Sequence, residues 1–357
     1  MSRYLPWIVG AALAAVPILY REPYPLHILV LILIWSFTYT SWAIMGRFGL
    51  TSLGHGGFMG IGAYVTALLW NDDITPWAGI PVALIAAGAL SLVVGYPCFR
   101  SRIRGHYFAL VTLALSGIVQ QVIIATRDVT GGSLGYTPRR ADGGSSLWAL
   151  QFSSKEAWYW IALAVWAAGI AIWYAIDRSM MRIALEAIAD DEDAAAAAGI
   201  DVTLEKLKIT LLSAVMTAFA GALYCQYQMF ISPDTVSGIG VSLQIVFAAV
   251  VGGVFVSLGP TFGAAITILL TESLRIAFGT AAVGYDNLVY GTLLVIFIIF
   301  LPKGILGSIL AHGGVASTAR DGLGGDVESG LLAGGPPRGG TGKRPDSGAP
   351  TERAPLT

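Results

Sequence analysis

The sequence predicts an all-α, polytopic membrane protein with about ten transmembrane helices. Apolar residues make up 55% of the 357 residues and charged residues only 12%, too few to cover the surface of a water-soluble fold of this length. The mean hydropathy is +0.70, and the apolar residues are gathered in runs long enough to cross a bilayer as helices. A net charge of −1 argues against nucleic acid as a partner, so the partner expected from composition is the lipid bilayer.

Ten apolar runs define the predicted spans. The first follows Arg3 and has no good small-residue cleavage site behind it, so we interpret it as a retained helix rather than a signal peptide. Glycines are concentrated in the first half of the third run, and further glycines lie around the eighth. The boundaries are about 5–20, 25–45, 54–70, 76–99, 105–126, 158–176, 209–230, 241–258, 260–278 and 287–301.

Lys and Arg residues in the short connections set the predicted orientation, because basic loops stay in the cytoplasm. The basic residues divide unequally between the two sides, and four of those on the poorer side lie in one long loop. Both chain termini are then predicted to be cytoplasmic. The richer side holds Arg3, Arg47, Arg100, Arg102, Arg104, Arg178, Arg182, Lys206, Lys208 and Lys303, and the poorer side holds Arg21, Arg127, Arg139, Arg140 and Lys155.

The predicted count of ten is consistent with two halves of five spans each. Because five is an odd number, the second half would cross the membrane in the opposite direction to the first, which makes an inverted 5+5 repeat. The third span of each half is rich in glycine, with Gly54 to Gly62 in one and Gly252 and Gly253 in the other. Interrupted apolar segments at corresponding positions of two halves are typical of a transport pathway. The halves share no evident residue-level similarity, so the repeat rests on this pattern alone.

A polar island, residues 177–208, separates the sixth and seventh spans and is predicted to be cytoplasmic. Residues 191–199 within it are predicted to form a short helix. Acidic residues at its start suit the positive end of the helix dipole, five alanines favour the helix, and Gly199 ends it. A helix with a smooth alanine surface and an acidic rim is suited to docking into another protein.

The sequence contains no complete catalytic or metal-binding motif. Residues 131–135 match G-x-S-x-G but lack the preceding strand, and residues 339–343 resemble a phosphate loop that misses two required positions. The four histidines have no metal spacing, and Cys98 and Cys225 lie in or at the end of apolar runs as expected of buried thiols. We therefore expect no enzymatic activity and no metal in this chain.

Two regions are predicted along the chain. Residues 1–312 would form the transmembrane domain that carries the island. The tail, residues 313–357, is rich in Gly, Pro, Ser and Thr and has too little apolar surface to fold, so we expect it to be a disordered cytoplasmic segment.

Several ordered motifs together resemble the LivM-type permeases of branched-chain amino acid ABC importers. The resemblance covers roughly residues 28–308, and a set of motifs at family spacing is more specific than any one of them. The motifs are residues 49–64 (GLTSLGHGGFMGIGAY), 104–113 (RGHYFALVTL) and 130–132 (TGG), together with Ala194-Ala195, Gly199-Ile200, Ser232-Pro233, Gly252-Gly253, Gly259-Pro260, Gly263-Ala264 and Pro302-Lys303-Gly304.

The resemblance implies the fold of an ABC importer permease in a bacterial inner membrane, serving the transport of branched-chain or related small amino acids. The implied partners are a second, homologous permease, two cytoplasmic ATPases that bind ATP and Mg, and an extracytoplasmic solute-binding protein. This chain would hold no cofactor itself. The island would be the coupling helix seated in a groove of an ATPase, with Glu186, Asp190, Asp191, Glu192, Ala194, Ala195, Ala197, Ala198 and Gly199 as coupling residues.

The glycine-rich segments also give a predicted translocation path. The spacing Gly56-x-x-x-Gly60 equally indicates close helix packing, and His55 between glycines is more readily explained as a structural residue than as a substrate contact. The predicted path comprises Ser52, Gly54, His55, Gly56, Gly57, Phe58, Tyr64, Tyr107, Thr112, Gly252 and Gly253.

Two alternative functions stay open at this point. The same fold could import urea, short amides, or aromatic and other carboxylic acids, because no residue fixes the solute. A secondary transporter or channel that needs no ATPase belongs to a different class. It would call for intramembrane acids and bases, and only Glu272 and Arg275 are available well inside a late span.

Overall fold

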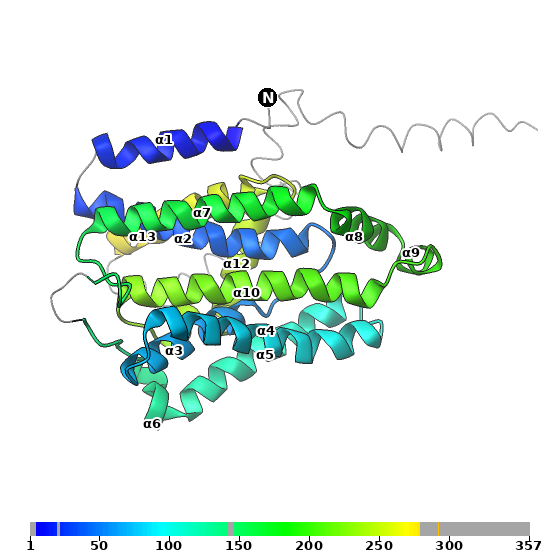
Figure 1. The fold of residues 1–357 in the computed structure, drawn as a ribbon, viewed down its shortest axis with the longest axis horizontal. Helices are drawn as coiled ribbons and strands as arrows, with labels where there is room; N and C mark the ends of the chain where they lie inside the picture. Colours follow the sequence, from blue (N-terminus) through cyan, green and yellow to red (C-terminus); the bar gives the residue numbers. More distant parts are fainter. Residues whose placement is uncertain (1–4, 20–21, 142–145, 279–291, 293–357) are drawn as a thin grey trace, which may run out of the picture. The chain divides into compact units, whose positions relative to one another are not determined.

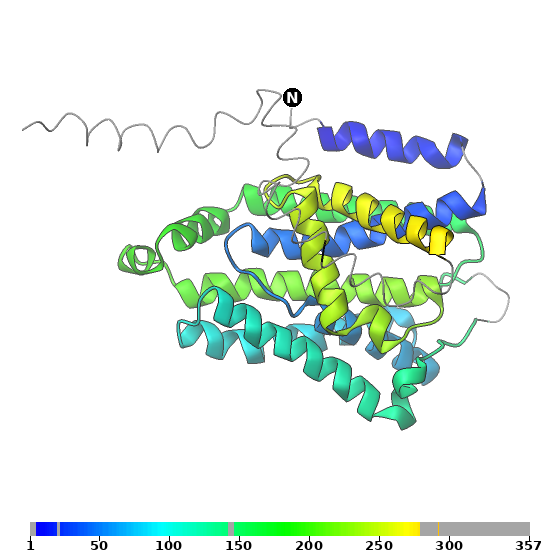
Figure 2. The same ribbon diagram turned by 180° about the vertical axis from the view of Figure 1, so that it is seen from behind.

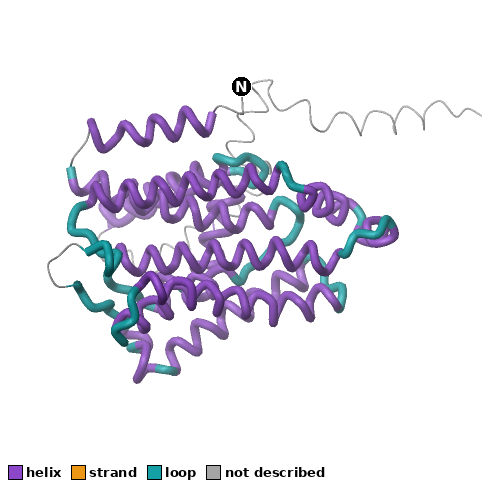
Figure 3. Tube along the Cα trace, in the orientation of Figure 1, coloured by secondary structure: helices purple, strands orange, loops and turns teal. Residues whose placement is uncertain are grey.

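The computed structural model describes residues 5–19, 22–141, 146–278 and 292. Throughout these ranges the chain forms helices joined by loops, with no named strand (Figure 3). Two isolated antiparallel bridges, Tyr136 with Ile231 and Ser146 with Gln151, hold loops together. The prediction of an all-α chain is therefore confirmed for the described residues.

The helices follow the predicted runs closely. In chain order they are α1 (Leu5–Leu19), α2 (Pro23–Gly46), α3 (His55–Asn71), α4 (Pro76–Arg100), α5 (His106–Ala125), α6 (Arg127–Thr130), the 3₁₀ turn η1 (Gly132–Leu134), α7 (Lys155–Asp177), α8 (Met180–Asp190), α9 (Glu192–Ala197), α10 (Val202–Gln228), α11 (Pro233–Val236), α12 (Gly238–Gly252) and α13 (Gly259–Phe278) (Figure 1).

Six helical segments in the described ranges are long and apolar enough to cross a bilayer: α2, α4, α5, α7, α10 and residues 233–252. This confirms a polytopic membrane protein. The helices α1 and α3 are shorter, with 15 and 17 residues. The predicted tenth span, 287–301, lies outside the described residues, so the count of ten and the inverted repeat stay predictions.

The core of the bundle is built around α2 and α10. The helix α10 packs against α2, α3 and α4, while α2 also packs against α7 and α13. The helix α12 runs across the others and contacts α3, α5 and α13 (Figure 2). Because α2 is apolar on all sides, it can be covered on all sides, and it is buried along most of its length.

The glycines of the third span serve close packing rather than a break in the helix. The helix α3 is continuous from His55, and the irregular backbone lies before it, in residues 47–54. Inside α3, a Cβ added to Gly62 would overlap the carbonyl group of Ala218 on α10, and one added to Gly60 would overlap the side chain of Ser237. Glycine is therefore required there for close approach of the backbones.

The helix α12 is shorter than the predicted eighth span of 241–258. It ends at Gly252, and Gly253 has a φ of +113°, a conformation that favours glycine. A tight connection then leads into α13. The interruption that the glycines predicted in this span is thus a helix end followed by a turn.

An ion pair ties α2 to α7 at the end of the bundle from which α8 and α9 extend, which we call the α9 end (Figure 1). Arg47 Nη1 lies 2.7 Å from Asp177 Oδ1. The Arg47 guanidinium also lies over the rings of Trp173 and Phe48, 4.1 and 4.7 Å from their centroids. Burial lowers the pKa of Arg47, and the Asp177 carboxylate opposes that shift.

Candidate functional site

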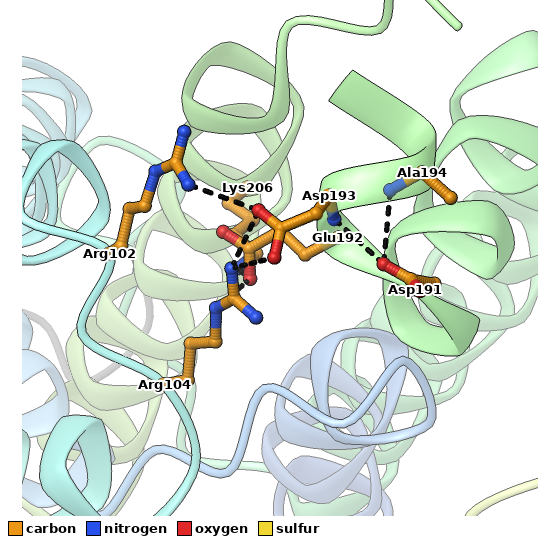
Figure 4. Close-up of polar contacts among 7 residues, drawn as sticks. All are labelled: Arg102, Arg104, Asp191, Glu192, Asp193, Ala194 and Lys206. Carbon is orange, nitrogen blue, oxygen red and sulfur yellow. Dashed lines mark hydrogen bonds and ion pairs between the residues drawn. The ribbon is translucent and has the colours of Figure 1, made fainter. Parts of the chain in front are cut away.

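The short helix predicted in the polar island is present as α9. The Asp191 carboxylate accepts hydrogen bonds from the amides of Asp193 and Ala194 at 2.9 and 3.0 Å and so caps the helix (Figure 4). These two bonds lower the pKa of Asp191 below its ordinary 3.8. Gly199, at a φ of +90°, ends the helix in the left-handed region as predicted.

The alanines of α9 do not all face outward. Ala195 is only 4% exposed and belongs to the hydrophobic core, whereas Ala194, Ala197 and Ala198 are exposed. The alanine surface is therefore one face of the helix, narrower than the sequence indicated. This face carries no charge of its own, and the exposed carboxylate of Asp193 lies at its edge.

Two further coupling residues of the sequence prediction lie on α8. Glu186 is exposed and forms an ion pair with Arg182 at 2.7 Å, which raises the pKa of Arg182. Asp190 is the exposed last residue of α8. A carboxylate at this position is disfavoured by the helix dipole, so helix stability does not explain its presence.

A network of ion pairs fixes the N-terminus of α9 (Figure 4). The Oε2 atom of Glu192 lies 2.7 Å from Lys206 Nζ and 2.9 Å from Arg104 Nε. Asp193 Oδ1 lies 3.0 Å from Arg102 Nη1 and 3.3 Å from Arg104 Nη2. The Glu192 and Lys206 side chains are 10% and 7% exposed, whereas those of Asp193 and Arg102 are 64% and 70% exposed.

Burial decides which of these contacts matters. Exposed ion pairs contribute about 0–1 kcal/mol, so the pair of Arg102 with Asp193 adds little. Leaving a buried charge without its partner costs about 3–5 kcal/mol. Glu192 is therefore the central residue of the network, and it is held from two sides, by α10 through Lys206 and by the α4–α5 connection through Arg104.

The local backbone explains how Arg104 reaches α9. The connection between α4 and α5 is only residues 101–105, and it turns at Arg102 and Gly105, which have φ values of +54° and +55°. With a ψ of −123°, Gly105 adopts a conformation that suits glycine. A pocket of about 410 Å³ lies beside the network and is lined by Phe48, Leu50, Phe108, Ile188 and Asp190 among others.

Within the predicted translocation path, His55 is held by a buried hydrogen-bond network. Its Nε2 lies 2.7 Å from Ser213 Oγ, and Ser213 donates its hydroxyl proton to the Ser41 carbonyl oxygen. Because Ser213 has one proton, His55 Nε2 must be the donor in the first contact. Its Nδ1 is buried and has no hydrogen-bond partner among the described residues.

The first turn of α3 meets α5 and α12. The amide of Gly56 donates to Ser242 Oγ at 3.0 Å, and Ser242 Oγ lies 2.9 Å from Ser116 Oγ. The amide of Leu53 donates to Thr112 Oγ1 at 2.9 Å. Three helices therefore share hydrogen bonds at the point where α3 begins.

Ser52, Gly54 and Gly57 belong to the same region. The Ser52 carbonyl oxygen accepts a hydrogen bond from Trp42 Nε1 at 2.7 Å. A Cβ on Gly54 or Gly57 would come within 3.1 or 3.3 Å of α5 backbone atoms. The structure thus gathers most of the predicted path residues around the start of α3, in close contact with their neighbours.

Other predicted path residues lie elsewhere. Tyr107 is 74% exposed on α5, and Gly252 packs against Gly259 at the α12–α13 turn. Phe58 and Tyr64 are buried along α3, about one and two and a half turns from its start. The lining of a substrate path by these residues stays a prediction.

Apart from Thr112, which was in the predicted path, sequence reasoning missed the hydroxyl partners and the basic partners of the site. Ser213 and Thr217 are four residues apart on α10, and Thr112 and Ser116 on α5, a spacing that puts each pair on one helix face. That repeat within an apolar run was the available signal. Lys206 gave no such signal, because a lysine at the start of a membrane span is usually solvated.

The family described as "Branched-chain amino acid transport system / permease component" matches residues 24–298. The chain is 29% identical over 287 residues to the "High-affinity branched-chain amino acid transport system permease protein LivM" of Escherichia coli (strain K12). This match covers 74% of the chain and 65% of that protein, so the chain spans less than two thirds of the length of this relative.

Two further relatives extend the comparison. The branched-chain amino acid permease protein LivH of Salmonella typhimurium is 28% identical over 278 residues, covering 74% of this chain and 88% of that protein. The "L-arabinose ABC transporter permease protein AraH" of Azospirillum brasilense is 25% identical over 232 residues, covering 62% of the chain and 63% of that protein. No solved structure shows significant similarity to the chain.

Proposed function

The chain belongs to the family of branched-chain amino acid transport system permease components, and from this premise we propose that it is a membrane-spanning permease subunit of an ABC importer. Together with a second permease it forms the path for branched-chain or related small amino acids. The observation that carries the proposal is α9, a capped helix with an exposed, uncharged alanine face at the end of a bundle of apolar helices.

The chain is a non-catalytic subunit in this proposal. ATP and Mg bind to two ATPases on the cytoplasmic side, and a solute-binding protein delivers the substrate from the outside. The second permease is a homologue of this chain, an arrangement supported by its similarity to both LivM and LivH proteins. The protein spans a bacterial inner membrane ten times, as an inverted 5+5 repeat, with both termini in the cytoplasm.

The face of α9 is the ATPase contact. Small side chains allow the close seating of one surface against another, and Ala197 and Ala198 offer such a surface without ordered charges to desolvate. The capping by Asp191 and the ion pairs of Glu192 keep the helix formed before the partner arrives, which reduces the entropy that binding must overcome.

The test of this contact compares two tryptophan variants of the assembled complex. Ala197→Trp should leave the permease in the membrane with its thermal stability changed by about 0.5 kcal/mol or less, as for a surface residue. It should nevertheless weaken the co-purification of the ATPases and reduce substrate-stimulated ATP hydrolysis. Ala195→Trp is the matched comparison, because Ala195 is buried and its replacement should destabilise the protein itself.

The outcome shows whether the exposed alanines of α9 form an ATPase contact or belong to an ordinary surface helix. Full ATPase co-purification and full substrate-stimulated hydrolysis with Ala197→Trp would show that α9 is an ordinary surface helix. Uptake driven by an ion gradient in proteoliposomes without any ATPase would contradict the proposal as a whole, because it would show that the protein is a secondary transporter.

The substrate is a separate question, and the similarity to the L-arabinose permease AraH keeps a wider range of solutes in view. Urea, short amides, and aromatic or other carboxylic acids are the alternatives. The solutes retained by the cognate binding protein, measured by calorimetry with a panel that includes leucine, valine, urea and benzoate, decide between them. Retention of leucine or valine supports the proposal, and retention of another class alone contradicts it.

A further inference from the structure

Two arginines of the α4–α5 connection, Arg102 and Arg104, contact the first turn of α9. Arg104 contacts both acidic residues of the first turn of α9, Glu192 through Nε and Asp193 through Nη2. The two segments are far apart in the sequence, so this contact is made only in the folded protein. Neither Ala197 nor Ala198 takes part in it.

We propose that Arg104 is a positioning residue that fixes α9 relative to α5, so that a movement of α9 is passed to α5. The inference rests on the proposed docking of an ATPase onto α9. It adds a route by which that docking acts on the membrane helices.

The covalent connections of α9 leave its direction free to change. The helix has six residues, and non-helical residues flank it on both sides, Asp191 before it and residues 198–201 after it. A helix between two such joints can rotate as a unit. Its direction is therefore set by side-chain contacts, and those at its N-terminus are made by Glu192 and Asp193.

Helix α5 connects this contact to the buried start of α3. Thr112 lies six residues after His106, the first residue of α5, which is about 9 Å along the helix, and it accepts a hydrogen bond from the amide of Leu53. Ser116, one turn further, contacts Ser242, which accepts from the amide of Gly56. A shift of α5 would therefore change the hydrogen bonds at the start of α3.

The exposed arginine of the same connection serves as an internal comparison. Arg102 contacts only Asp193, and both side chains are mostly exposed. Arg104 shares a mostly buried oxygen of Glu192 with Lys206. Because water screens the first contact more than the second, Arg104 holds α9 more firmly than Arg102 does.

The experiment uses the complete importer in proteoliposomes, with both permeases, the ATPases and the solute-loaded binding protein. Arg104→Gln keeps the size and polarity of the side chain but removes its charge. We expect the ATPases to co-purify and the stimulation of ATP hydrolysis by the loaded binding protein to fall about tenfold, or ~1.4 kcal/mol. Arg104→Lys should recover part of the stimulation, and Arg102→Gln should behave as the unmodified protein.

A double-mutant cycle tests whether Arg104 acts through Glu192. If it does, Arg104→Gln should add little to the loss already caused by Glu192→Gln. Because Glu192→Gln leaves Lys206 without its partner and could prevent assembly, Asp193→Asn provides a second cycle with an exposed residue.

The outcomes separate this inference from the proposed function. If the unmodified permease fails to bind ATPases, the proposed function fails. If it binds them and Arg104→Gln retains full stimulation, or if the losses from Arg104→Gln and Glu192→Gln simply add, only the positioning role is overturned. Loss of ATPase co-purification in Arg104→Gln also overturns it, because the residue would then serve assembly.

Discussion

Replacing Gly62 by alanine should destabilise the membrane domain, although alanine is the better helix former. A Cβ at this position would lie 2.6 Å from the carbonyl carbon of Ala218 and 2.7 Å from its Cα, whereas ordinary contacts begin at 3.4 Å. Both atoms are backbone atoms and cannot rotate away. The helices α3 and α10 would have to separate by roughly 1 Å, a gap that forfeits a quarter to a half of the dispersion energy of each contact it opens.

The magnitude follows from two opposed terms. Alanine in place of glycine in a helix gains about 1 kcal/mol. Overpacking at a rigid contact costs about 3 kcal/mol, the upper part of the usual range, since no flexible side chain can yield. The expected net destabilisation is about 2 kcal/mol, which corresponds to a decrease of about 3 °C in the unfolding temperature of a chain of this size.

The assay is the thermal unfolding of the detergent-solubilised permease, together with uptake in proteoliposomes. Gly117→Ala on α5 is the matched control, because no atom lies within 4 Å of its added Cβ, and it should unfold at the same or a higher temperature. We expect Gly62→Ala to lower both stability and uptake. If Gly62→Ala unfolds no earlier than Gly117→Ala, close approach of α3 and α10 is not the reason for glycine at position 62.

Two further predictions concern the C-terminal tail and the cap of α9. Truncation after Gly313 should leave uptake and ATPase binding intact, because the tail cannot bury a core; a loss of either in the truncated protein would make the tail a docking element. The lowered pKa of Asp191 means that its capping is fully present above its ordinary value of 3.8 and is lost as pH falls through the lower folded value. Hydrogen-exchange protection of the Ala194 amide should therefore decline only in that acid range, and Asp191→Asn, which stays neutral, should show no such decline; an equal decline in both variants would contradict the assignment.

The sequence predicted elements whose signals are local. The acidic residues, alanines and glycine of α9 lie within nine residues, and all of them act on the helix they belong to. The apolar runs likewise predicted the long helices, because membrane spanning depends on composition and length. These signals need no knowledge of what packs against the element.

The details of the candidate site depend on neighbours and were not available from the sequence. An alanine helix has no polar face to orient it, so the burial of Ala195 could not be distinguished from the exposure of Ala197. The glycines of α3 indicate close approach but not which helix approaches. The pairing of Glu192 with Arg104 joins segments that are distant in the chain, and the start of a helix gives no indication of such a partner.

The near-complete burial of α2 has a consequence for how the protein is made. Its Ser36, Tyr39 and Ser41 side chains are within hydrogen-bond distance of Thr261, Gln244 and Thr217, and all three of those partners are synthesised far later. When α2 is inserted into the membrane, it is therefore surrounded by lipids or by the insertion machinery, and these side chains do not yet have their interhelical hydrogen-bond partners. Nascent chains that stop before α10 should therefore be recognised by membrane quality control, and the packing of α2 should be completed only after α10, α12 and α13 have been inserted.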